Sequence, residues 1–175
     1  DPSGSDPGGE FIEIYNATPI SLTLSSYKVG DEETIDQSGT PQDSMAAFPG
    51  GYQVPSGGII VVARSSSAFS TTFAFLPDFE FTSQRPDVPD MLSYVNWDSD
   101  VLSSITLGNT GDEVLLLDGS DTVIDVATYE GGSWPGVSNN LTANDGESLE
   151  RIPADWDTND MTIDFAVRAN DGDPG

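Results

Sequence analysis

The sequence predicts an all-β sandwich built from about eight short strands. Stretches of alternating or β-branched apolar residues recur along the 175 residues, and clusters of Gly, Pro, Asn and Asp separate them. Helical periodicity is almost absent. A chain of this length fits one domain, so we predict a single domain over residues 1–175, with a long loop or insertion at about 65–104.

The first two predicted strands lie near the N-terminus. In residues 10–16 the apolar side chains of Phe11 and Ile14 interleave with carboxylates, which is typical of a strand with charge at its edges. Residues 21–29 also alternate, and we predict a second strand there with a bulge at 25–26.

The strongest core strand is predicted at residues 59–64, where a continuous β-branched run indicates burial on both faces. Residues 65–79 combine Phe with Ser and Thr and predict a short helical turn that leads into an aromatic-rich loop. Residues 84–100 hold two prolines and four aspartates, which is typical of a long loop.

The C-terminal half predicts a hairpin and three further strands. Residues 113–118 and 122–129 flank a Gly-Ser-Asp turn and form the hairpin. A positive-φ turn is expected at 108–111. The remaining strands are predicted at 105–107, 147–152 and 161–168.

Composition excludes several kinds of chemistry. The chain has no cysteine and no histidine, which removes disulfides, thiolate metal sites and any histidine-based catalytic triad. Its 30 acidic and 5 basic residues give a net charge of -25, which repels phosphate backbones and anionic lipids. We therefore expect no nucleic-acid partner. No apolar run is long enough for a transmembrane helix, so we expect no direct membrane insertion. Three accounts of the charge stay open, namely a salt-rich habitat, divalent cations bound to surface carboxylates, and simple solubility.

Six motifs, taken in order, resemble the lamin-tail domain in the form found in secreted and surface proteins of bacteria and archaea. They lie at residues 10–16, 24–27, 54–63, 107–118, 124–129 and 146–151. The resemblance implies an immunoglobulin-like antiparallel β-sandwich. It also implies a non-catalytic module for attachment or assembly, not an enzyme, at an extracellular or cell-surface location.

The chain departs from that family at its start. Members usually begin with a hydrophobic strand before a Pro/Gly/Ser/Asp loop like residues 1–9, and this strand is missing here. Either the strand is lost or dispensable, or a neighbouring subunit supplies it by strand addition. The second reading predicts self-association into a filament or surface lattice, because head-to-tail donation builds an open polymer. The alternative function is an accessory binding domain of a larger secreted enzyme, such as a hydrolase or nuclease.

An acidic cluster near the C-terminus is the candidate metal site. Asp155, Asp157, Asn159 and Asp164 offer oxygen ligands at spacings that suit Ca²⁺, although the EF-hand glycine and glutamate positions are not matched. The alternative is a solvated turn. No other cofactor is expected. Weaker acidic candidates are Asp1, Asp6 and Glu10 in the first loop and Asp87 and Asp90 in the long one.

Other residue types give alternatives of their own. Asn16 and Asn140 fit the N-glycosylation pattern, which also arises by chance in a Ser/Thr-rich chain. Glu147 and Glu150 are three residues apart on a strand and point to opposite faces, so ion pairing with Arg151 is favoured over a glycosidase pair. The tryptophans Trp97, Trp134 and Trp156 are expected to plug the ends of the sandwich, with sugar stacking as the alternative.

Overall fold

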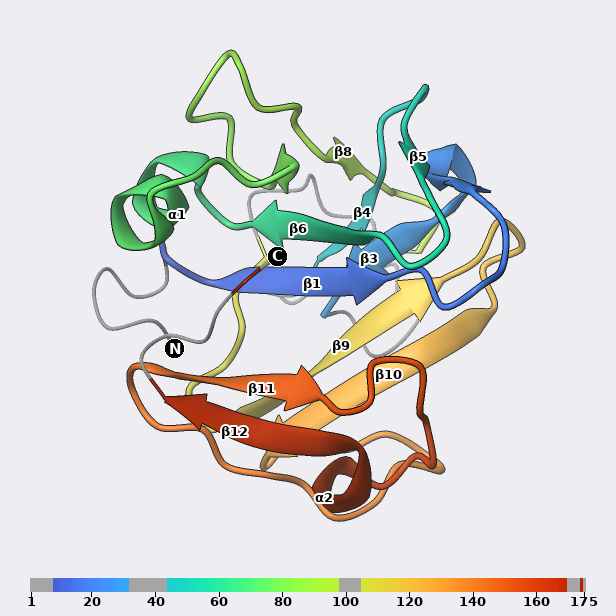
Figure 1. The fold of residues 1–175 in the computed structure, drawn as a ribbon, viewed down its shortest axis with the longest axis vertical. Coiled ribbons are helices and arrows are strands. Elements are labelled where there is room, and N and C mark those ends of the chain that lie inside the picture. Colours follow the sequence, from blue (N-terminus) through green and yellow to red (C-terminus); the bar gives the residue numbers. More distant parts are fainter. Residues whose placement is uncertain (1–7, 32–43, 98–104, 170–173, 175) are drawn as a thin grey trace.

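The computed structural model describes residues 8–31, 44–97, 105–169 and 174 and has an antiparallel β-sandwich at its centre (Figure 1). One sheet has the strand order β1-β6-β7, formed by Phe11–Tyr15, Ile59–Ala63 and Phe79–Glu80. The pair β1 and β6 is antiparallel, with Phe11 opposite Ala63 and Tyr15 opposite Ile59, whereas β6 and β7 are parallel. The all-β prediction is confirmed.

The second sheet has five strands in the order β10-β9-β3-β4-β8. Its strands are β10 (Val123–Glu130), β9 (Gly111–Leu117), β3 (Lys28–Gly30), β4 (Met45–Ala47) and β8 (Leu92–Ser93). The predicted hairpin is confirmed, because β9 and β10 pair in antiparallel register. Asp118 Oδ1 accepts hydrogen bonds from the amides of Ser120 and Thr122 and closes the turn between the two strands. At the start of β9, Gly111 has a φ of 120°, and a Cβ there would lie 2.1 Å from the nitrogen of Gly131.

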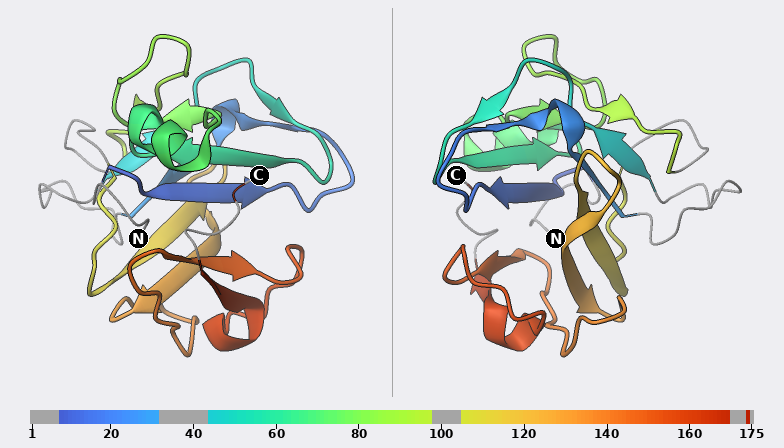
Figure 2. Two further views of the ribbon diagram at one scale, coloured as in Figure 1. Left: turned by 60° about the vertical axis from the view of Figure 1, so that its left-hand side comes forward. Right: turned by 90° about the vertical axis from the view of Figure 1, so that its right-hand side faces the viewer.

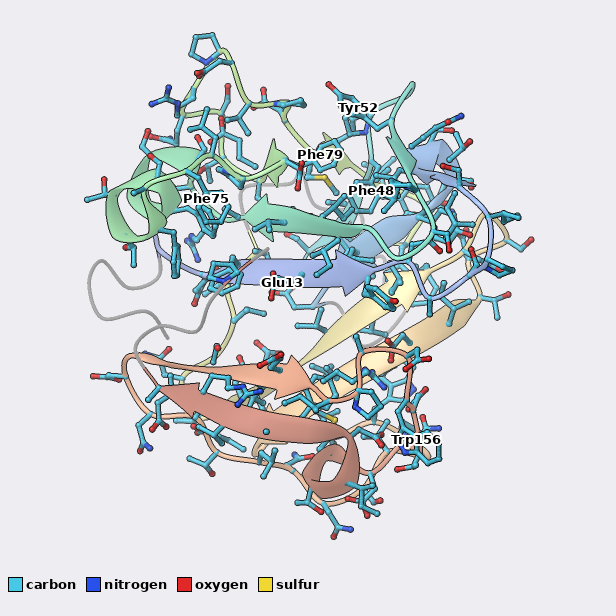
Figure 3. The ribbon with its side chains drawn as sticks, viewed as in Figure 1. Glu13, Phe48, Tyr52, Phe75, Phe79 and Trp156 are labelled. Carbon is cyan, nitrogen blue, oxygen red and sulfur yellow. The ribbon has the colours of Figure 1, made fainter. Side chains whose placement is uncertain are left out.

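The main core lies between these two sheets. Its buried apolar residues come from both, with further contributions from the loops: Ile12, Leu24, Val29, Ala46, Phe48, Val54, Ile60, Val62, Phe79, Phe81, Met91 and Ile105. The ring of Phe79 meets the rings of Phe48 and Tyr52 edge to face, with centroid distances of 5.2 Å and 4.9 Å, and Figure 3 labels all three residues. A smaller sheet, β2 (Leu22–Thr23) with β5 (Gln53–Val54), lies in the same half of the molecule.

Helix α1 (Ser66–Phe73) packs beside the β1-β6-β7 sheet. It begins where Ser65 Oγ accepts a hydrogen bond from the amide of Ala68, and it ends at Ala74, which has a φ of 62°. Phe69 is fully buried and meets Phe11 edge to face, with ring centroids 5.5 Å apart. The short helical turn predicted in this region is therefore a complete helix.

A separate hairpin lies below β1 in Figure 1. It consists of β11 (Glu147–Arg151) and β12 (Phe165–Ala169), with the four-residue helix α2 (Met161–Asp164) between them. The views in Figure 2 place this hairpin beside β9 and β10, on the same side of the molecule as the side of β1 that does not pair with β6.

Three of the predicted strands differ from the structure. Residues 21–29 do not form one bulged strand, because the 3₁₀ turn η1 (Leu24–Ser26) buries Leu24 and separates β2 from β3. Residues 105–107 are not a strand, since the Arg64 guanidinium binds the carbonyl of Ile105 and the hydroxyl of Thr106. The strand predicted at 161–168 starts only at Phe165 because Asp160 caps α2. The stretch 65–104 holds α1, β7 and β8 in its described part.

Candidate functional site: a groove beside strand β1

A groove with a volume of about 410 Å³ separates β1 from the β11–β12 hairpin. Its lining residues come from β1, β9 and β10 and from both strands of the β11–β12 hairpin, whose arrangement Figure 1 shows. Ile14, Val114, Leu116 and Leu149 line it and are only half-buried. The groove therefore presents partly accessible apolar side chains next to β1.

Strand β1 presents its outer edge to this groove. Just before and after β1, the backbone carbonyl of Glu10 accepts from the backbone amide of Arg64, and the backbone amide of Asn16 donates to the carbonyl of Gly58. The backbone groups of the even-numbered residues of β1 therefore point toward β6. Because backbone groups alternate along a strand, the amides and carbonyls of Phe11 and Tyr15 point the other way. Among the described strands, β1 is the end of its sheet. The sequence predicted a vacant strand position beside residues 10–16, and this edge is where such a position would lie.

The groove is strongly acidic. Six carboxylates and two guanidiniums line it: Glu10, Glu13, Asp125, Glu130, Glu147, Glu150, Arg151 and Arg168. The label in Figure 3 places Glu13 on β1. Burial and the nearby carboxylate of Asp112 raise the pKa of Tyr129, another lining residue, above its usual range. We call the half-buried apolar residues Ile14, Val114, Leu116 and Leu149 the floor of the groove, and the more accessible carboxylates of Glu13, Glu130 and Glu147 its rim.

Arg151 connects the hairpin wall to the sheet. Its guanidinium lies 2.6 Å from Asp125 on β10 and 3.2 Å from Asp157, and it stacks 4.7 Å from the ring centre of Phe165. Burial raises the pKa of Asp125, and the charge of Arg151 opposes that rise. The sequence predicted pairing of Arg151 with its neighbours Glu147 and Glu150, and that prediction is wrong.

The two glutamates have other partners. Glu150 pairs with Arg168 across the hairpin, because these residues lie on adjacent strands. Glu147 Oε2 accepts hydrogen bonds from the backbone and side-chain nitrogens of Asn144, and these bonds lower its pKa.

The predicted calcium ligands lie on the loop before α2 and on α2 itself. Asp164 is buried, and its two carboxylate oxygens accept hydrogen bonds from the amide and the hydroxyl of Thr158, each at 2.8 Å. Asp157 pairs with Arg151 and accepts from the amide of Asn159, while Asp155 is exposed. In the described part of the chain no three carboxylates gather at metal-binding distances. Calcium binding stays a prediction, and a calcium ion here would compete with these bonds.

Of the weaker acidic candidates, those in the described residues have separate partners. Asp1 and Asp6 lie outside the described residues. Glu10 is buried and its Oε2 lies 3.4 Å from Arg64, Asp87 pairs with Arg85, and Asp90 forms an isolated bridge with Glu80.

Both glycosylation candidates support turns. Asn16 is 3% exposed, and its Nδ2 donates to the carbonyls of Ile20, Val54 and Pro55. Asn140 Nδ2 likewise donates to two carbonyls, at 3.0 Å and 2.5 Å. A glycan on either nitrogen would replace one of its two hydrogens and break at least one of these hydrogen bonds, so any glycosylation would have to precede folding or rearrange the turn.

The three tryptophans have different surroundings. Trp97 is buried and Trp134 half-buried in a second apolar cluster with Leu115 and Leu117, behind β9 and separate from the core between the two sheets, so their place differs from the predicted plugs at the ends of the sandwich. Trp156 is 54% exposed on the loop that follows β11 and lies at the margin of the molecule in Figure 3. Plugging the sandwich therefore does not explain Trp156.

Sequence patterns alone did not indicate several of the most tightly bonded polar residues. Lys28 is buried and lies 2.5 Å from Asp121 Oδ1, and the hydroxyl of Tyr94 donates to the same carboxylate. Although burial acts to raise it, hydrogen bonds from Lys28 and Tyr94 hold the pKa of Asp121 below its usual value. Each partner comes from a different segment, so only the folded chain brings them together.

The model of the lamin tail domain family matches residues 1–131, about three quarters of the chain. The chain belongs to the lamin tail domain family. The family is an immunoglobulin-like, non-catalytic domain, which confirms the resemblance and the fold class that the sequence predicted. A comparison of this lamin tail domain with curated proteins found no match. The match stops before β11, α2 and β12, so β11, one wall of the groove, lies outside the matched residues.

The helices of the lamin tail domain are short. In the residues that the structure describes, none is long and apolar enough to cross a membrane.

Proposed function

We propose that this lamin tail domain is a non-catalytic assembly module of an extracellular or cell-surface structure. In this proposal its groove receives an extended segment of a neighbouring protein, which adds to the sheet along β1. The observation that carries the proposal is the outward-facing edge of β1 beside a groove with apolar side chains on its floor. Strand addition fits such an edge because backbone hydrogen bonds supply affinity and alternate side chains enter the groove.

Repetition of this contact would build a filament or lattice. If one domain supplied a strand and received another, the contact would be head-to-tail and would not close on itself. The proposal needs no catalytic group, which agrees with the non-catalytic character of the family and with the absence of histidine and cysteine.

A substitution at Tyr15 tests the proposal directly. Tyr15→Pro removes an amide that points to the groove and leaves the amides that pair with β6, and Pro is tolerated on edge strands. Tyr15→Thr is the matched control, because it removes the same ring but keeps the amide. In cells that make the native protein, we expect Tyr15→Pro to release the domain from the sedimented surface fraction and Tyr15→Thr to leave it there. Equal retention of both folded variants would exclude strand addition at β1.

A second candidate function is an accessory binding domain of a larger secreted enzyme. The exposed ring of Trp156 favours it, since an accessible indole next to the carboxylates of Asp155 and Asp157 suits a sugar ring. We expect such a domain to bind insoluble polysaccharide and to lose that binding on Trp156→Ala. Retention of the substituted protein at the wild-type level would remove this candidate.

A further inference from the structure

We infer that the occupant of the groove is an extended segment of a different chain, in which apolar residues alternate with Lys or Arg. The inference rests on the proposed function and specifies the chemistry of the partner. Two properties of the groove lead to it, the pattern of its floor and the sign of its charge.

The floor of the groove selects for alternation. Ile14, Val114 and Leu149 come from β1, β9 and β11, and all three face the groove half-buried. A strand lying between β1 and β11 would direct every second side chain to this floor and the others toward the rim and solvent. Apolar side chains at the first set of positions would complete the burial of the floor.

The rim selects for positive charge at the other positions. Carboxylates outnumber guanidiniums six to two in the groove, and both guanidiniums already pair with carboxylates of the same groove. Arg151 binds Asp125, and Arg168 binds Glu150. An acidic segment entering here would meet like charge, whereas Lys or Arg would meet opposite charge.

The lamin tail domain itself does not offer such a segment. Its five basic residues all lie in ion pairs within the fold: Lys28, Arg64, Arg85, Arg151 and Arg168. The sequence of residues 1–7, 32–43, 98–104 and 170–175 contains no Lys or Arg and several Asp and Glu. Residues 1–175 of a second copy would therefore bring negative charge to a negative groove.

Synthetic peptides test the inference on the full chain. The probes are a nine-residue peptide that alternates valine with lysine, a matched peptide that alternates valine with glutamate, and a peptide with the lysines and valines in two separate blocks. Calorimetry in 50 mM NaCl should show the alternating lysine peptide binding at least tenfold more tightly than the other two. Its affinity should fall at least fivefold in 500 mM NaCl, where screening shortens the reach of the rim charges.

Variants separate a specific site from general attraction to an acidic protein. The double variant Glu13→Gln/Glu130→Gln removes two rim charges, and Asp87→Asn/Asp90→Asn removes two charges elsewhere on the surface. We expect the first pair to weaken binding of the lysine peptide at least threefold and the second to leave it unchanged. Tyr15→Pro should abolish it, with Tyr15→Thr as the control.

Each contrary result has a distinct meaning. Equal binding of the lysine and glutamate peptides, lost in both cases on Tyr15→Pro, would overturn the charge inference and leave the proposed function standing. Equal weakening by the two double variants would show general attraction and overturn the inference. No binding of the lysine peptide would also overturn it, while the surface-fraction experiment decides the proposed function separately. Salt-promoted self-association that Tyr15→Pro prevents would identify a second copy as the occupant instead.

Discussion

The guanidinium of Arg151 on β11 lies 2.6 Å from the carboxylate of Asp125 on β10. This ion pair fastens the β11–β12 hairpin to the large sheet, and it lies in the lining of the groove. Arg151 is mostly buried, whereas Asp125 is partly open to solvent. The pair therefore holds one wall of the groove in place, so changes to it should affect both stability and the groove.

We predict that Arg151→Met lowers the free energy of unfolding by about 1–3 kcal/mol at neutral pH, because it leaves Asp125 without its cation. The folded-state pKa of Asp125 is already raised, so its charge costs stability above that pKa and the cost disappears as the pH falls through it. The difference from wild type should therefore shrink in acid. Urea unfolding at pH 7 and pH 4 measures it, and Arg168→Met, in a more exposed pair, is the control.

Glu80 should be the most sensitive carboxylate in the fold. It is fully buried, its Oε2 accepts from the amide and hydroxyl of Ser66, and its Oε1 accepts from the amides of Gln84 and Arg85. Glu80→Gln puts an NH₂ group against hydrogen-bond donors in either orientation, so we expect a loss of about 2–4 kcal/mol. Thermal unfolding measures the loss. Asp87→Asn, nearby and exposed, should leave the melting temperature unchanged, and a comparable drop there would contradict the interpretation.

Asn16 can be tested by the smallest possible change. Asn16→Asp replaces an NH₂ group that donates to three backbone carbonyls with an oxygen that repels them, in a site that is almost fully buried. We predict a loss of about 2–4 kcal/mol. The exposed Asn159 gives the control, since Asn159→Asp should change stability by less than about 0.5 kcal/mol. Equal effects of the two substitutions would show that Asn16 is not a structural support.

The sequence indicated the parts of the fold that have a local pattern. The β-branched run of β6 and the apolar stretches of β9 and β10 are long enough to show the pattern of a strand. Gly119, Ser120 and Asp121 between β9 and β10 are residue types that favour turns. Strands of two or three residues, such as β4 and β8, are too short to show a period. Pairing of Arg151 with Asp125 joins residues 26 positions apart, and no local rule predicts it. The edge of β1 was predicted because the family resemblance supplied the missing neighbour, whereas the acidic groove needed the placement of β11.

Trp97 and Trp156, for which the sequence predicted the same role, should differ in how much they contribute to stability. Trp97 is 5% exposed and packs in the cluster behind β9, so Trp97→Ala should cost about 3–5 kcal/mol. Trp156 is 54% exposed, and Trp156→Ala should cost less than about 0.5 kcal/mol. Urea unfolding of the two variants makes the comparison. A large loss for Trp156→Ala would assign its ring to the packing of the hairpin and would weaken its use as a binding platform.

The net charge of -25 should make stability depend on salt. Self-repulsion opposes folding, and the Debye length falls from about 10 Å at 0.1 M to about 3 Å at 1 M, so we expect NaCl to raise the melting temperature over this range. CaCl₂ at matched ionic strength separates the accounts of the charge. Equal rises in the two salts would mean that screening is sufficient and would argue against the calcium prediction. A larger rise in calcium that Asp155→Asn removes would instead establish the predicted site at Asp155, Asp157, Asn159 and Asp164, because a screening effect would survive the loss of a single exposed carboxylate.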